Sequence, residues 1–75
     1  MLIMNQTQFN SFPGIQINGS SAKYSGISLK KSKSFLTQNI QNAEAETRKY
    51  LQANKLAFLV NESDRIVSIW HEVQA

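Results

Sequence analysis

The chain has 75 residues, no cysteine and a formal net charge of +3. A chain of this length forms one domain with a thin stability margin, so many such domains depend on a partner or on a second copy. The absence of cysteine excludes disulfides and thiolate-bound zinc, which leaves packing alone to hold the fold.

The first residues, MLIM, are apolar, but neither a basic region nor a long apolar run accompanies them, which argues against a secretory signal peptide. No apolar run in the chain is long enough to span a membrane. We therefore expect a cytoplasmic protein without a membrane partner.

Residues 1–11 are rich in Asn and Gln around Phe9 and show no sustained hydrophobic period. They are predicted to be a mobile or irregular lead-in to a domain that covers residues 12–75. Apolar alternation then predicts strands at residues 14–18 and 23–30. The turn-forming residues between them, Asn18 to Ser21, predict a hairpin.

From Ser34 the hydrophobic period changes from two to about 3.6, which predicts a helix over residues 35–53. Ser34 is the predicted N-cap, because its hydroxyl can accept from amides of the first turn. Asn54 tolerates the left-handed conformation that closes many helices. The side chains expected to be largely buried, on this helix and on the strands after it, are Leu36, Ile40, Tyr50, Leu51, Phe58 and Ile69.

Two apolar runs, LAFLV and RIVSIWHEV, flank the polar stretch NESD, and this pattern predicts a second hairpin with strands at residues 56–60 and 65–73. Both runs carry apolar residues on both faces, whereas a single helix covers only one face of a sheet. Either the N-terminal residues or another molecule must cover the second face, so a homodimer or an obligate partner is expected.

Together these elements predict an α+β fold, a single ββαββ domain whose four-stranded, mainly antiparallel sheet packs on one helix. With a right-handed crossover, the first and last strands would lie side by side and parallel at the centre of the sheet.

The residue pattern argues against an enzyme. His71 is the single histidine, and no nucleophile motif such as G-x-S-x-G accompanies it. The chain has no HExxH sequence, EF-hand loop or cysteine pair for a metal, and its three glycines lack Rossmann or Walker spacing. We therefore expect a non-enzymatic protein with no metal and no cofactor.

Two non-enzymatic functions fit this pattern. The first is a protein-binding module, an inhibitor or adaptor of a larger macromolecular machine, of the kind encoded by phages and mobile elements. Trp70, Phe58 and Tyr24 are its candidate anchors, because Trp and Tyr are the residues most often found at binding hot spots. A lone Trp in a small domain is, however, more often part of the core.

The alternative is a nucleic-acid or phosphate-binding protein. Up to residue 33 the only charged side chains are Lys23, Lys30, Lys31 and Lys33, whereas the four later cations face five carboxylates. Three of these lysines precede the predicted helix, where positive charge opposes the helix dipole unless an anion binds there. A solvated loop would accommodate the same lysines at negligible cost, and a small basic surplus is common on protein surfaces.

Overall fold

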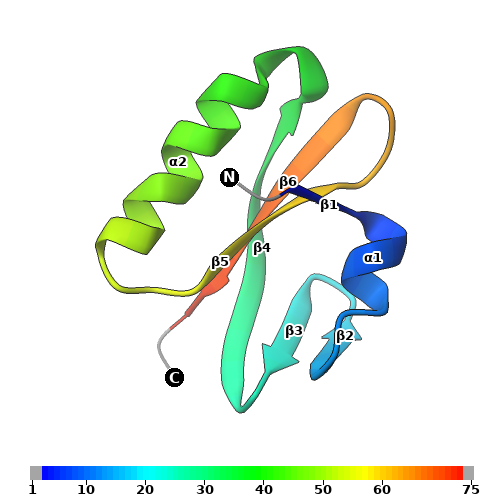
Figure 1. The fold of residues 1–75 in the computed structure, drawn as a ribbon, viewed down its shortest axis with the longest axis vertical. Coiled ribbons are helices and arrows are strands. Elements are labelled where there is room, and N and C mark those ends of the chain that lie inside the picture. The colour runs from blue at the N-terminus through cyan, green and yellow to red at the C-terminus, as the bar shows by residue number, and fades with distance from the viewer. Residues whose placement is uncertain (1–2, 74–75) are drawn as a thin grey trace.

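The computed structural model describes residues 3–73 and contains one six-stranded sheet with the strand order β1-β5-β6-β4-β3-β2 (Figure 1). In chain order the elements are β1 (Ile3–Asn5), α1 (Gln6–Asn10), β2 (Ile15–Asn18), β3 (Ser21–Tyr24), β4 (Ile27–Leu36), a 3-10 turn (Thr37–Asn39), α2 (Ile40–Gln52), β5 (Ala57–Asn61) and β6 (Ile66–Glu72). Residues 1 and 2 of the predicted lead-in and residues 74 and 75 of the predicted domain lie outside the described residues.

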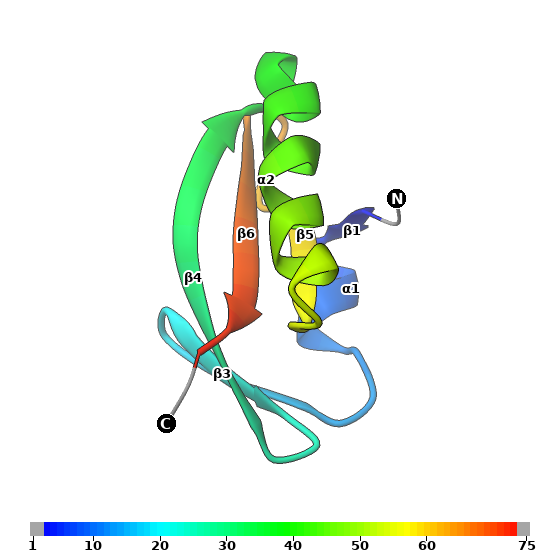
Figure 2. The ribbon, with the colours of Figure 1, turned by 90° about the vertical axis from the view of Figure 1, so that its left-hand side faces the viewer.

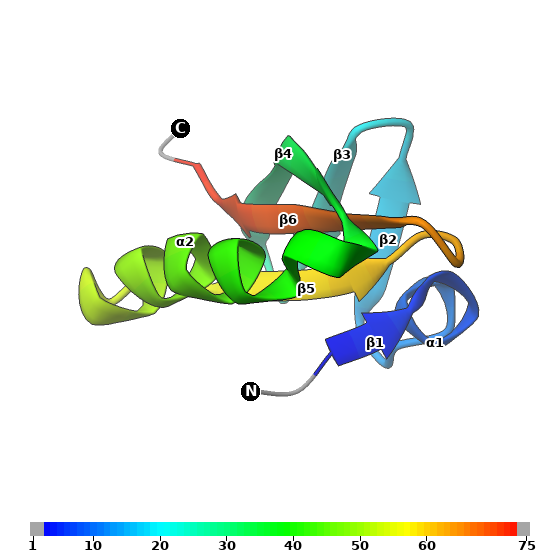
Figure 3. The same ribbon diagram turned by 90° about the horizontal axis from the view of Figure 1, so that it is seen from above.

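The fold is α+β, but the predicted four-stranded sheet is wrong. The sheet has six strands, is mixed because β1 runs parallel to β5, and curls into a half-barrel (Figure 3). The expected central pair is also wrong, because β2 lies at one edge whereas β6 lies between β5 and β4. The single strand predicted over residues 23–30 is interrupted by a turn at Ser25 and Gly26, whose φ angles are 50° and 82°. The strand predicted at residues 14–18, its hairpin turn at Asn18 to Ser21 and the final hairpin lie close to where the sequence predicts them.

The described part of the N-terminal segment is regular and not an irregular lead-in. The Asn5 side chain accepts from the Gln8 amide at 2.7 Å, and the Gln8 side chain accepts from the Asn5 amide at 3.0 Å. This reciprocal capping box starts α1 and places Phe9, which is completely buried, over the sheet. The Asn-x-x-Gln spacing was the sequence signal for this turn.

The long helix begins later than predicted. Ser34 and Phe35 pair with Ser68 and Val67 of β6, so Ser34 belongs to a strand and is not a helix cap. A bulge between Lys31 and Lys33 shifts the register by one residue and reverses the alternation of side chains along β4. This reversal concealed the second half of the strand from pattern analysis. At the other end of the helix, Asn54 has the left-handed φ expected of it, 61°.

Two apolar clusters lie on opposite faces of the sheet. One is sandwiched beneath α2, which lies along the β5–β6 face (Figure 2), and its buried members are Ala43, Leu59, Val67 and Ile69. The other lies on the concave face, and its buried members are Met4, Phe9, Ala22, Leu29, Val60 and Trp70. The N-terminal residues therefore cover the second face, which was one of the two expected solutions.

Burial differs from the expectation for several residues. Ile69 is fully buried, but Leu36 and Leu51 are exposed by 51% and 45%, so their predicted burial is wrong. Leu36 ends a strand, and Leu51 lies in the last turn of α2. The other three predicted core residues, Ile40, Tyr50 and Phe58, are half-buried. Within residues 3–73, no helix combines the length and the apolar character needed to cross a membrane.

Candidate functional site at the open edge of strand β4

Strand β4 is much longer than the strand beside it. It has 10 residues, whereas β3 has four and pairs only as far as Lys30, which lies opposite Ser21. One further hydrogen bond, from the Lys31 amide to the Ser20 carbonyl at 2.9 Å, ends the contact. Among the described residues, no strand pairs with residues 32–36 on this side, and we call this segment the open edge (Figure 2).

The hydrogen-bond pattern shows which backbone groups the open edge presents. The Thr37 amide donates to the Arg65 carbonyl at 2.7 Å and continues the ladder between β4 and β6. Because such ladders alternate, Phe35 also faces β6, whereas the N–H and C=O groups of Ser34 and Leu36 point away from it. These two residues therefore offer the groups that an added strand would bond.

The side of the open edge that faces α2 is a polar groove of about 510 Å³, lined by Lys33, Ser34, Phe35, Asn42, Ala45 and Glu46. The Glu46 carboxylate accepts from Lys33 Nζ at 3.1 Å and from Lys49 Nζ at 2.9 Å. Hydrogen bonds from Lys49 and then Lys33 lower the pKa of Glu46, and Glu46 in turn raises the pKa of Lys49. Two cations share one carboxylate, so this side carries a local surplus of positive charge.

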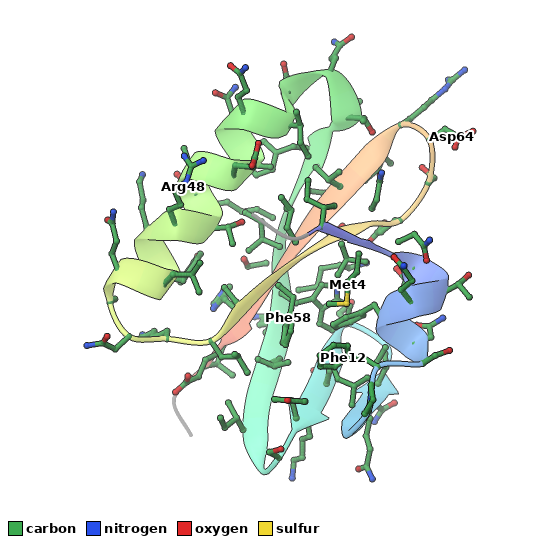
Figure 4. The ribbon with its side chains drawn as sticks, in the orientation of Figure 1. Met4, Phe12, Arg48, Phe58 and Asp64 are labelled. Atoms are coloured by element: carbon green, nitrogen blue, oxygen red, sulfur yellow. The ribbon has the colours of Figure 1, made fainter. Side chains whose placement is uncertain are left out.

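The opposite side of the open edge carries exposed apolar side chains at its end. Leu36 and Ile66 are cross-strand neighbours and are exposed by 51% and 38%. A hollow of about 320 Å³ adjoins them and is lined by Leu36, Thr37, Gln38, Asp64 and Arg65. Figure 4 shows Asp64 pointing outward from the connection between β5 and β6. An incoming strand would therefore meet positive charge on one face and apolar side chains on the other.

A polar cluster ties the inner face of β4 to the rest of the sheet. Lys31 Nζ lies 2.9 Å from Glu62 Oε1, and the same oxygen accepts from Ser68 Oγ at 2.5 Å. The hydroxyls of Ser68 and Ser34 lie 3.1 Å apart. The hydrogen bond from Ser68, followed by that from Lys31, lowers the pKa of Glu62. These contacts hold the start of the open edge in place.

The predicted protein-binding anchors lie in the concave core. Trp70 is 2% exposed, and its ring centroid lies 5.1 Å from that of Phe9. Phe58 and Tyr24 are half-buried, and their ring centroids lie 5.9 Å apart. Figure 4 shows Phe58 close to Met4 and Phe12, between α1 and β5. Trp70 therefore packs the interior, the more frequent place of a lone Trp in a small domain, and is not exposed on a sheet face as the binding hypothesis required.

The structure separates the predicted lysine cluster. Lys31 and Lys33 make ion pairs on opposite faces of β4, with Glu62 and Glu46 respectively. Their predicted location in front of a helix is wrong, because the 3-10 turn starts only at residue 37 and α2 at residue 40. Lys23 and Lys30 lie apart from both ion pairs, on β3 and the first half of β4.

Pattern analysis missed the open edge. The run LKKSKSF was its signal, because lysines and bulges are typical of strand edges that natural proteins protect from uncontrolled pairing. Within residues 3–73, no group of three or more His, Asp or Glu residues is placed to hold a metal ion. No protein-family model, curated protein or solved structure matches this chain.

Proposed function

We propose that the protein is a non-enzymatic protein-binding module that takes an extended segment of its partner as an additional strand on the open edge of β4. The observation that carries this proposal is the outward orientation of the backbone groups of Ser34 and Leu36 beside the exposed Leu36 side chain. Strand addition derives affinity from backbone hydrogen bonds and specificity from alternate side chains.

The two sides of the open edge indicate the chemistry of the partner segment. The surplus charge of Lys33 and Lys49 over Glu46 favours carboxylates on the side that faces α2. Leu36 and Ile66 favour apolar residues on the other side. Because side chains alternate along a strand, the matching segment alternates acidic and apolar residues.

The lysines and the bulge give such an edge selectivity. They disfavour pairing with neutral or basic strands and thereby protect the protein from edge-to-edge aggregation. An acidic segment would be attracted by the same positive charge. The lysines would therefore both exclude neutral or basic strands and favour an acidic one. An inhibitor or adaptor role in the cytoplasm is consistent with this mode of binding and is part of the proposal.

The substitution Leu36→Pro tests the proposal, because it removes one outward N–H group without disturbing the ladder to β6. Leu36 already has a φ of −67°, close to the value of about −65° that proline imposes. Leu36→Val is the matched control, because it keeps both an apolar side chain and the N–H group. Both variants should remain folded, with their stability changed by less than about 1 kcal/mol.

The measurement is affinity capture from the native host, with and without nuclease, followed by hydrogen exchange on the recovered complex. We expect a discrete protein that wild type and Leu36→Val retain, that Leu36→Pro loses, and that protects the amides of Ser34 and Leu36. Equal capture by Leu36→Pro, with both amides unprotected, would contradict strand addition. Protection of the same amides by a second copy of this chain would replace the foreign partner with a homodimer.

A further inference from the structure

The outer face of β2, β3 and the first half of β4 contains a hollow of about 520 Å³ that lies apart from the open edge. We call it the lysine hollow, and its lining is Gln16, Ile17, Asn18, Ser21, Ala22, Lys23, Ser28, Leu29, Lys30 and Val73. We infer that the lysine hollow binds phosphate groups, a function separate from the proposed strand addition.

The sheet register places two lysines together in this hollow. Lys23 lies opposite Ser28, and Lys30 lies opposite Ser21, so both lysines project from the same face of the β3–β4 hairpin. They are diagonal neighbours across the strand pair, a relation that corresponds to about 7 to 8 Å between residues. Two flexible ammonium groups at this spacing can reach one phosphate or two successive phosphates.

Lys23 and Lys30 differ from Lys31 and Lys33 in their charge environment. Lys31 and Lys33 each make an ion pair with a glutamate, whereas Lys23 and Lys30 make no ion pair within residues 3–73. Among residues 3–73 no carboxylate lines the hollow, and the first acidic residue in the sequence is Glu44. The local field is therefore positive, and a positive concave surface attracts anions.

The neutral residues of the lysine hollow are suited to the same ligand. The amides of Gln16 and Asn18 and the hydroxyls of Ser21 and Ser28 surround the two lysines. All of these groups can donate hydrogen bonds to phosphate oxygens. A hollow that combines two cations with four neutral donors fits a phosphate group better than it fits an acidic protein surface. A protein surface would also require apolar contacts.

A phosphate group has two sources, a small phosphate compound or the backbone of a nucleic acid. Titration of the isotope-labelled chain with inorganic pyrophosphate, and separately with a single-stranded oligonucleotide, distinguishes them. Amide signals of the β3–β4 hairpin that shift with pyrophosphate would identify a small-phosphate site. Shifts with the oligonucleotide alone would identify a nucleic-acid backbone site.

The double variant Lys23→Gln/Lys30→Gln removes both cations from the hollow. Its matched control is Arg48→Gln/Arg65→Gln, which loses the same charge on α2 and on the β5–β6 connection, away from the hollow. We expect the lysine variant to lose at least about tenfold in affinity and the control to stay close to wild type. For a single-stranded oligonucleotide, the slope of log K against log salt should flatten by about 1.4.

Two outcomes would overturn the inference. If neither pyrophosphate nor the oligonucleotide shifts the hairpin signals of the wild-type chain, the hollow is not a phosphate site. If both double variants lose affinity equally, binding reflects net charge and not the hollow. The edge variant Leu36→Pro should bind both probes as wild type does. Phosphate binding and strand addition can therefore be confirmed or contradicted separately.

Discussion

Glu62 is the residue whose ionisation matters most for the strand that carries the open edge. Its carboxylate joins Lys31 of β4 to Ser68 of β6, and the side chains of Lys31 and Glu62 are only 32% and 25% exposed. A partly buried carboxylate with two donors is stabilised in its charged form, which is why its pKa is lowered. The contribution of this cluster to stability therefore depends on pH.

Glu62→Gln should destabilise the protein in a pH-dependent way. The pKa of Glu62 is lowered in the folded state from its ordinary value of 4.5, so its contribution is fully present above that pH. The contribution is lost as the pH falls through the lowered folded-state pKa. We expect a loss of about 1 kcal/mol at neutral pH that vanishes in acid, measured by urea unfolding at several pH values.

Asp64→Asn is the control for this prediction, because Asp64 lies in the same connection between β5 and β6 and is exposed. It removes the same charge without removing the contacts to Lys31 and Ser68. A difference between wild type and Glu62→Gln that stays constant from neutral to acidic pH would show that the ionised carboxylate is not the source of the stability.

At the scale of elements, β4 serves two different neighbours along its length. Its first half is central, between β3 and β6, whereas its second half pairs, among residues 3–73, with β6 alone. The bulge between Lys31 and Lys33 marks the point where the neighbour changes and where the faces of the strand reverse. A single strand can therefore complete the lysine hollow at one end and form a free edge at the other.

Hydrogen exchange should alternate along the open edge in the isolated protein. The amides of Ser34 and Leu36 should exchange rapidly because they point away from β6, whereas the amide of Phe35 should be protected by the ladder. NMR-detected exchange at several protein concentrations is the measurement. Equal protection of Leu36 and Phe35 would mean that the edge is covered, and loss of that protection on dilution would identify a second copy as the cover.

At the scale of the whole molecule, the N-terminal segment closes the half-barrel. β1 extends the sheet beside β5, and α1 directs Phe9 onto Trp70 and Phe58, with ring centroids 5.1 and 5.7 Å away. Phe9 is completely buried in the concave cluster, which also contains Met4 of β1. The small domain thus obtains from its own chain the cover that a partner was expected to supply.

Phe9→Ala should cost about 3 to 5 kcal/mol, because it removes the aromatic side chain at the centre of the concave cluster and leaves a cavity. That is a large part of the stability of a domain of this size. Leu51→Ala, at an exposed position on α2, is the control and should change stability by less than about 1 kcal/mol. The free energy of unfolding, measured with denaturant, tests this prediction. Equal losses of that free energy in the two variants would show that α1 does not pack as described.

Local signals in the sequence were sufficient for several features. Alternation and the polar NESD stretch identified the hairpin of β5 and β6, the 3.6-residue period identified most of α2, and Asn54 marked its end. Composition alone revealed that the first half of the chain carries the unbalanced positive charge. These signals depend on neighbours within a few residues, so no knowledge of the tertiary structure was required.

Tertiary structure alone decided the sheet and the candidate site. The bulge in β4 reverses its alternation, so a ten-residue strand resembled a short strand followed by a helix start. The short elements β1 and α1 are stable only because the sheet and Phe9 pair with distant partners. Which lysines are neutralised, and which edge of β4 stays open, depends on contacts between residues more than ten positions apart. Such contacts produce no periodic pattern in the sequence, because these ion pairs and strand neighbours join residues that come together only in the folded sheet.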